Sequence, residues 1–206
     1  MRVLVACEFS GVVREAFRKL GHDAYSCDLL PSELPSPYHI QGDVLKAISD
    51  GWDLLVAHPP CTRLCNSGVR WLAERNLWGE LRESAAFFRA FLEAPVERIV
   101  VENPIPHKYA LELIGRKYDQ VIQPYMFGEP ESKATCLWLK NLPQLLPTKW
   151  VQDRKQRCYL ETPSPERWKN RSRTYQGIAD ALASQYGSSE KPNQVMFQQS
   201  LSFDAS

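Results

Sequence analysis

The stretch RVLVACEFSGVVREAFRKLG, residues 2–21, contains a strand pattern, a turn and a helix pattern in direct succession. The apolar run Arg2–Cys7 predicts a buried strand, and Gly11–Leu20 has the apolar spacing of an amphipathic helix. Gly21 follows as the expected helix C-cap. A buried strand that leads through a short turn into a helix is typical of an α/β sheet, so this stretch points to the fold class.

The rest of the chain repeats the alternation. Further strands are predicted at Asp23–Cys27, Asp53–Ala57, Glu97–Val101, Asp119–Gln123 and Thr135–Leu139, and further helices at Leu81–Leu92 and Arg173–Tyr186. We expect a doubly wound, mostly parallel sheet. The loops after the strands then lie along one edge, where ligands of such sheets bind.

Composition sets wide bounds. The 206 residues are 44% hydrophobic and 24% charged with a formal net charge of +1, which predicts an ordinary soluble domain. Any contact with nucleic acid must therefore come from local clusters of basic residues. The six cysteines, with no secretory signal and no membrane-spanning stretch, predict a cytoplasmic protein with free thiols.

Three candidate ligand-binding features follow the first strands. The turn ACEFSG, residues 6–11, lets a ligand approach the backbone and the helix N-terminus, but it also fits a plain tight turn. Asp28 is placed to accept hydrogen bonds from ribose hydroxyls, or to cap a loop. Asp43 is placed to receive an adenine amino group, or to be the N-cap of the helical segment Val44–Ser49.

The segment AHPPCTRLCNSG, residues 57–68, places a thiol after a buried strand. Two prolines fix the backbone there and direct Cys61 toward the sheet edge. Cys61 is a candidate nucleophile, with a small buried hydrophobe as the alternative. No second Cys/His pair complements Cys61 and Cys65, so we expect no zinc. His58 either tunes Cys61 or bonds a backbone carbonyl, and we favour the carbonyl.

The segment VENP, residues 101–104, places Glu102 at the end of a neighbouring strand. A carboxylic acid between apolar residues is expected to have a raised pKa and to act as a proton donor. The alternative roles of Glu102 are a cap or an ion-pair partner.

Taken together, these motifs resemble those of DNA cytosine-5 methyltransferases. The matching positions are Phe9-Ser10-Gly11 for the turn that binds S-adenosylmethionine, Asp28 and Asp43 for the two acids, Pro60-Cys61 for the catalytic Pro-Cys and Glu102-Asn103 for the Glu-Asn pair. The segment YMFGEPESKATCLWL, residues 125–139, is similar to the family's late strand, and RTYQGIADALA, residues 173–183, to its closing motif.

The resemblance implies a Rossmann-like, S-adenosylmethionine-dependent methyltransferase fold and a covalent mechanism. Cys61 would attack carbon 6 of a flipped cytosine, Glu102 would protonate or hydrogen-bond nitrogen 3, and carbon 5 would take the methyl group. Lys133 stands near the place of a family arginine and would lie close to the cytosine carbonyl. The implied cofactor-binding residues are Phe9, Ser10, Gly11, Asp28, Asp43 and Pro59.

The chain departs from the family in its recognition region. Only the short segment 140–171 stands where the family has a large domain, so the sequence resembles a phage-like, reduced member with domain limits 1–187 and a disordered tail at 188–206. Basic residues interleave with Trp150 and Trp168 there and would contact DNA, or form a solvated loop; they are Lys149, Arg154, Lys155, Arg157, Lys169 and Arg171.

The short region favours relaxed specificity, a single-stranded substrate or a cytosine nucleotide. A catalytically silent protein that binds cofactor, DNA or a partner is the alternative. An amino-methyltransferase is disfavoured because the turn His58-Pro59-Pro60-Cys61 lacks the acid or amide and the aromatic residue of that class.

Overall fold

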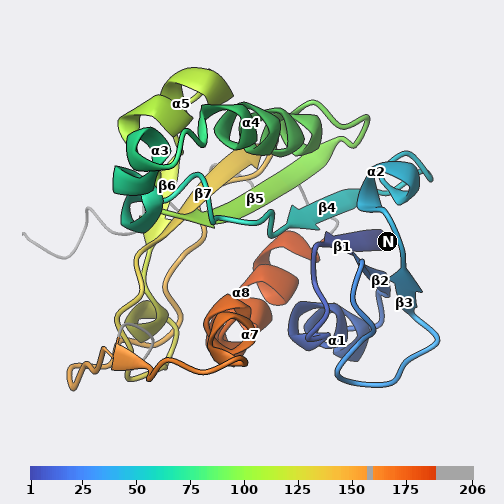
Figure 1. Ribbon diagram of the computed structural model, residues 1–206. Coiled ribbons are helices and arrows are strands. Elements are labelled where there is room, and N and C mark those ends of the chain that lie inside the picture. The colour runs from blue at the N-terminus through green and yellow to red at the C-terminus, as the bar shows by residue number, and fades with distance from the viewer. Residues whose placement is uncertain (157–159, 189–206) are drawn as a thin grey trace, which may run out of the picture.

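The computed structural model describes residues 1–156 and 160–188, and it confirms the predicted mostly parallel, doubly wound α/β sheet of Rossmann-like type. Seven strands within these residues follow the order β3-β2-β1-β4-β5-β7-β6 (Figure 1). Their bounds are β1 Arg2–Ala6, β2 Asp23–Asp28, β3 His39–Gln41, β4 Leu54–Ala57, β5 Arg98–Pro104, β6 Gln120–Ile122 and β7 Thr135–Lys140. Only β7 runs against its neighbours, pairing antiparallel with both β5 and β6.

Helices cover both faces of the sheet. On one side lie α1 (Val12–Lys19), α7 (Arg167–Ser172) and α8 (Gln176–Tyr186), and on the other lie α3 (Arg70–Glu74), α4 (Trp78–Leu92) and α5 (Lys108–Ile114) (Figure 1). The short elements are α2 (Val44–Ala47), η1 (Asn66–Gly68) and η2 (Pro124–Met126). Side chains alternate across a strand, so Leu4 packs on the α4 side while Val3 and Val5 pack on the α8 side.

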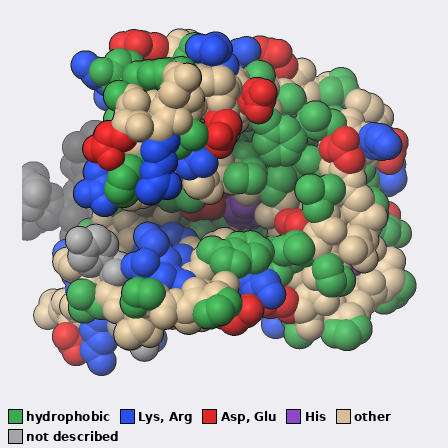
Figure 2. All heavy atoms as spheres, viewed as in Figure 1, with side chains coloured by type: hydrophobic (Ala, Val, Ile, Leu, Met, Phe, Trp, Pro, Cys, Tyr) green, Lys and Arg blue, Asp and Glu red, His purple; other side chains and the backbone are tan. Residues whose placement is uncertain are grey.

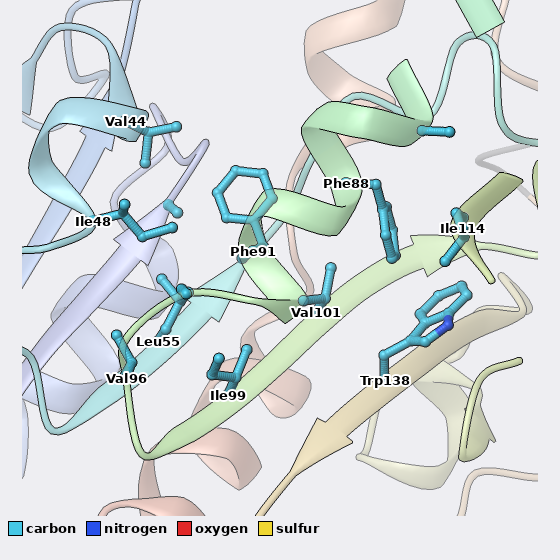
Figure 3. Close-up of a cluster of buried hydrophobic side chains, with 14 of the residues drawn as sticks. Val44, Ile48, Leu55, Phe88, Phe91, Val96, Ile99, Val101, Ile114 and Trp138 are labelled. Carbon is cyan, nitrogen blue, oxygen red and sulfur yellow. The ribbon is translucent and has the colours of Figure 1, made fainter. Parts of the chain in front are cut away.

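The α4 side holds a dense aromatic core (Figure 3). Phe88 and Phe91, three residues apart on α4, are fully buried against the sheet. The rings of Phe88 and Trp138 meet edge to face at 4.8 Å, an arrangement that adds about 0.5–1.5 kcal/mol beyond the buried area. Phe87, one residue before Phe88, is only partly buried and packs at the edge of this core.

The predicted elements are largely confirmed, with shifted bounds: α4 begins at Trp78 rather than at Leu81, and β5 runs to Pro104 rather than to Val101. The closing helix α8 begins at Gln176 rather than at Arg173, and α3, α5 and α7 were not predicted. Ser188 continues from α8, and its carbonyl accepts a hydrogen bond from Arg98. Arg157, Cys158 and residues 189–206 of the predicted tail 188–206 lie outside the described residues. No helix in the described ranges is long and apolar enough to cross a membrane.

Candidate active site

The turn after β1 is built around a buried carboxylate. Glu8 accepts hydrogen bonds from the backbone N–H groups of Val13 (2.6 Å) and Arg14 (3.2 Å), so it caps the N-terminus of α1. Burial raises the Glu8 pKa, while the charge of His58 and the two backbone donors act in the opposite direction. The helix N-terminus is therefore occupied by the chain's own carboxylate.

Glycine is required at position 11 by the left-handed backbone conformation and by the lack of room for a side chain. Its φ is +77°, and a Cβ there would lie 2.5 Å from the guanidinium of Arg14. Arg14 is fully buried and donates to the Ser26 hydroxyl at 2.8 Å. Phe9 and Ser10 are also buried, and the Phe9 ring lies 5.9 Å from that of Trp168 in α7. The turn is thus largely buried and packs against α7.

Asp28 and Asp43 lie at neighbouring strand ends, as predicted. Asp28 accepts a hydrogen bond from the Leu30 N–H at 2.9 Å, and burial raises its pKa. Asp43 is the N-cap of α2 and accepts from the Leu45 N–H at 3.0 Å. Of the two roles that the sequence allowed for Asp43, the helix cap is the one present here.

The Pro-Cys turn is tied to the end of β5. The side-chain amide of buried Asn103 donates to the Pro59 carbonyl at 2.8 Å. After the prolines the chain turns at once, because the Leu64 and Cys65 N–H groups both donate to the Cys61 carbonyl. This geometry brings the turn that carries Cys61 next to the Glu-Asn pair. The sequence predicted that the two motifs lie near each other, but not which atoms join them.

The Cys61 and Cys65 thiols influence each other's pKa, and the Cys65 sulfur lies 3.0 Å from the Ser67 hydroxyl. The hydrogen bond from Cys61 and those from the Ser67 hydroxyl and backbone lower the pKa of Cys65 to about 5. The Cys61 pKa is raised by that same bond, by burial and by the charge of Glu102, and Lys133 offsets this in part. Cys61 is therefore the protonated member of the pair. All five described cysteines are free thiols, as predicted.

The His58 imidazole bonds the Glu102 carboxylate rather than a backbone carbonyl, so the favoured prediction for His58 was wrong. The Nδ1 of His58 lies 3.0 Å from the Oε2 of Glu102. The strand register explains the contact: Ala57 pairs with Val101, so the next residue of each strand points to the same face. The sequence offered a signal for this contact, because His58 in AHPP and Glu102 in VENP each come directly after the last apolar residue of a predicted strand. This signal was missed.

The expectation of a raised Glu102 pKa was also wrong. Burial alone would raise it, but the His58 hydrogen bond, the charges of His58 and Lys133, and a hydrogen bond with Thr135 hold the pKa below its usual range. Glu102 is therefore an ionised carboxylate at neutral pH.

A pocket opens between the sheet and the start of α8. Figure 2 shows a hollow on this side of the molecule, with histidine and acidic side chains visible at its floor. The polar lining is His58, Glu102, Lys133, Thr135, Thr174 and Tyr175, and the apolar lining is Val56, Val100, Leu137, Ile178 and Leu182. Lys133 donates to the Arg171 carbonyl at 2.8 Å and so links the pocket to α7.

The basic residues predicted to contact DNA fall into two groups. Lys169 and Arg171 lie on α7. The Arg171 carbonyl accepts a hydrogen bond from Lys133, and Lys169 forms an ion pair with Glu166 at 3.1 Å. Lys149, Arg154 and Lys155 are exposed and run beside the segment between β6 and β7, where the Arg154 guanidinium lies 3.8 Å from the Tyr125 ring centre. Lys and Arg side chains gather on both sides of the hollow in Figure 2.

No protein-family model and no curated protein matches the sequence. Among solved structures, the chain is similar to a protein provisionally assigned as a DNA modification methyltransferase of an E. coli prophage (14% identity, TM-score 0.48, 73% of this chain and 52% of that one). It is also similar to a methyltransferase of Entamoeba histolytica (14% identity, TM-score 0.45, 73% and 57%). The chain thus spans about half the length of either protein. These likenesses are distant, so the function proposed below rests on the site.

Proposed function

We propose that this protein is an S-adenosylmethionine-dependent methyltransferase that methylates carbon 5 of cytosine in DNA. The observation that carries the proposal is the 2.8 Å hydrogen bond from Asn103 to the Pro59 carbonyl, which joins the Pro-Cys turn to the Glu-Asn strand end. A thiol on a stiff turn and a carboxylate beside it are the two groups that covalent catalysis on a pyrimidine needs.

The edge formed by β1, β2 and β3 fits the cofactor. Phe9, Ser10 and Gly11, the carboxylates of Asp28 and Asp43, and Pro59 follow adjacent strands, so a nucleoside can lie across them. When bound there, S-adenosylmethionine supplies an electrophilic methyl group. The chain's own residues hold the cofactor and direct the cytosine toward it.

The thiol pair prepares the nucleophile. The two sulfurs share one proton, and Cys61 attacks carbon 6 of the cytosine in the state in which this proton lies on Cys65. Lys133 acts through its positive charge, which favours the Cys61 thiolate. Cys65 is thus a base next to the nucleophile, a role that the sequence did not suggest.

Glu102 serves nitrogen 3 of the ring. Glu102, ionised in the free protein, takes up a proton from water when the cytosine binds. Attack at carbon 6 drives electron density onto nitrogen 3, and this proton then moves from Glu102 to the nitrogen. The neighbours of Glu102 favour its carboxylate form, so the proton is released readily and the remaining charge stabilises the protonated ring. Carbon 5 becomes nucleophilic and takes the methyl group.

The substrate is DNA with little sequence readout. Lys169 and Arg171 on one side, and Lys149, Arg154 and Lys155 farther along, offer charge for phosphates, and Trp150 and Trp168 are exposed at 60% and 54% for base stacking. So short a recognition surface suits single strands or flipped bases.

Methyl transfer from labelled S-adenosylmethionine tests the proposal. Mixed-sequence DNA, single- and double-stranded, and cytidine nucleotides are offered to wild type, Cys61→Ala, Glu102→Gln and the control Glu112→Gln, an exposed carboxylate on α5. We expect label on cytosine carbon 5 from wild type and control, none from Cys61→Ala and about 100-fold less from Glu102→Gln. Cofactor binding without any transfer would instead favour the silent binding protein.

A further inference from the structure

His58 lies between a carboxylate and the pocket. Its Nδ1 is held by Glu102 at 3.0 Å, and its side chain is only 9% exposed. The strand register fixes this orientation, because β4 and β5 pair in parallel up to Ala57 and Val101. The imidazole is therefore locked by the sheet itself.

The second ring nitrogen of His58 is buried without a partner. Within the described part of the chain, the Nε2 of His58 makes no hydrogen bond. A buried polar atom left unpaired costs about 1–3 kcal/mol, so such atoms call for an explanation. His58 lines the pocket, so a group bound there would pair with Nε2.

The charged groups around His58 suit a base that becomes cationic. Glu102 faces it from β5 and the buried Glu8 faces it from the turn after β1. Both carboxylates stabilise an imidazolium, while Lys133, whose charge acts on Glu102, lies across the pocket. A histidine at the wall of a pocket that is oriented by a carboxylate, and whose other ring nitrogen has no hydrogen-bond partner, has the arrangement of a general base.

We propose that His58 is the base that removes the proton from carbon 5 of the methylated adduct, an inference that rests on the proposed function. The Nε2 lone pair takes the proton, the carbon–hydrogen electrons form the double bond between carbons 5 and 6, and the bond from carbon 6 to the Cys61 sulfur breaks. Cys61 leaves as thiolate. The imidazolium, paired with Glu102, then returns the proton to water.

The other groups at the pocket are less suited to this step. Lys133 donates a hydrogen bond to the Arg171 carbonyl, and Glu102 is assigned to nitrogen 3. Among the described side chains that line the pocket, His58 is the one with a buried nitrogen that makes no hydrogen bond.

The experiment follows two labels in one reaction. DNA carrying tritium at cytosine carbon 5 is mixed with carbon-14-labelled S-adenosylmethionine, and wild type is compared with His58→Asn, whose amide can still donate to Glu102 in place of Nδ1. His58→Gln is the second variant in case the first does not fold, and His22→Asn, remote from the pocket, is the matched control.

We expect wild type and His22→Asn to release one tritium for each methyl group transferred. In the His58 variants, tritium release falls by about 100-fold, methyl transfer stops near one per enzyme, and a methylated protein–DNA adduct accumulates that is absent when Cys61 is also replaced by Ala. Equal release and transfer at the wild-type rate in a folded His58 variant overturns the proposal. Failure of wild type to transfer any methyl group overturns the proposed function, and this step with it.

Discussion

The Asn103 side chain and the Pro59 carbonyl are joined by a 2.8 Å hydrogen bond that crosses from β5 to the turn after β4. Asn103 is 2% exposed, so water cannot replace the bond. Because the turn carries Cys61 two residues later, this bond sets the position of the nucleophile relative to Glu102.

Replacing Asn103 by Asp should therefore impair catalysis more than folding. The carboxylate would face the Pro59 carbonyl without a donor, which we expect to lower stability by about 1–3 kcal/mol and methyl transfer by about 100-fold. The matched control is Asn141→Asp, because Asn141 donates to the Glu97 carbonyl at 2.8 Å in the segment before β5 begins. The control should lose stability but keep its rate per folded molecule; equal rate losses would contradict this role for Asn103.

Gly11→Ala tests the turn after β1. The substitution imposes a left-handed backbone at φ +77° and a contact of 2.5 Å with the Arg14 guanidinium. Gly21→Ala is the comparison, because Gly21 has φ +81° but nothing within 4 Å of an added Cβ. Both should lose about 1–2 kcal/mol from the backbone term, and only Gly11→Ala should lose more and weaken cofactor binding, as measured by urea unfolding and calorimetry.

Cys65 should be alkylated before Cys61 at pH 7. The Cys65 pKa is lowered to about 5 by its hydrogen bonds from Cys61 and Ser67, so Cys65 is a thiolate, whereas the raised pKa of Cys61 keeps it protonated. Brief treatment with iodoacetamide followed by peptide mass mapping measures the order. We also expect Cys65→Ser to slow methyl transfer about tenfold. Faster modification of Cys61 would show that the proton lies on the Cys65 sulfur, and Cys65→Ser should then leave methyl transfer unchanged.

The ion pair of Glu33 with Arg173 should make stability depend on pH. The two side chains meet at 2.6 Å and lie 33% and 38% exposed, and Arg173 lowers the Glu33 pKa. The pair's contribution is present above the unfolded pKa of about 4.3 and is lost as pH falls through the lower folded pKa. Solvent screening limits it to about 1 kcal/mol, so Glu33→Gln should be less stable than wild type by this amount at pH 7 but not near pH 2.

Much of the fold was readable because strand and helix periods differ. The fully buried runs at β1, β4 and β5 and the amphipathic α1 leave little choice of element or of sheet type. The short helices α3 and α7 escaped prediction because they bury little apolar surface: α3 buries only Leu72, and α7 buries no side chain within its described residues. Such helices depend on tertiary contacts that periodicity does not encode.

The sequence allowed single candidate residues of the site to be named, but not the contacts between them. Cys61 and Glu102 stood out because both follow predicted buried strands, whereas the pKa of Glu102 was predicted in the wrong direction. The Glu102 pKa depends on His58 and Lys133, and the Cys61 pKa on Cys65, which are contacts made across the fold. The direction of such a pKa shift depends on the distances between charged groups in the fold. The sequence gives only the order of the residues along the chain.

The contact between Phe9 and Trp168 can form only late in the synthesis of this protein, because its two partners lie far apart in the sequence. At roughly 5–20 residues per second, a ribosome makes Trp168 about 8–30 seconds after Phe9. Until then, the turn after β1 lacks the ring that covers it. A nascent chain that has been made as far as β7 therefore still lacks this ring contact, and the turn after β1 can complete its packing only once α7 has been made.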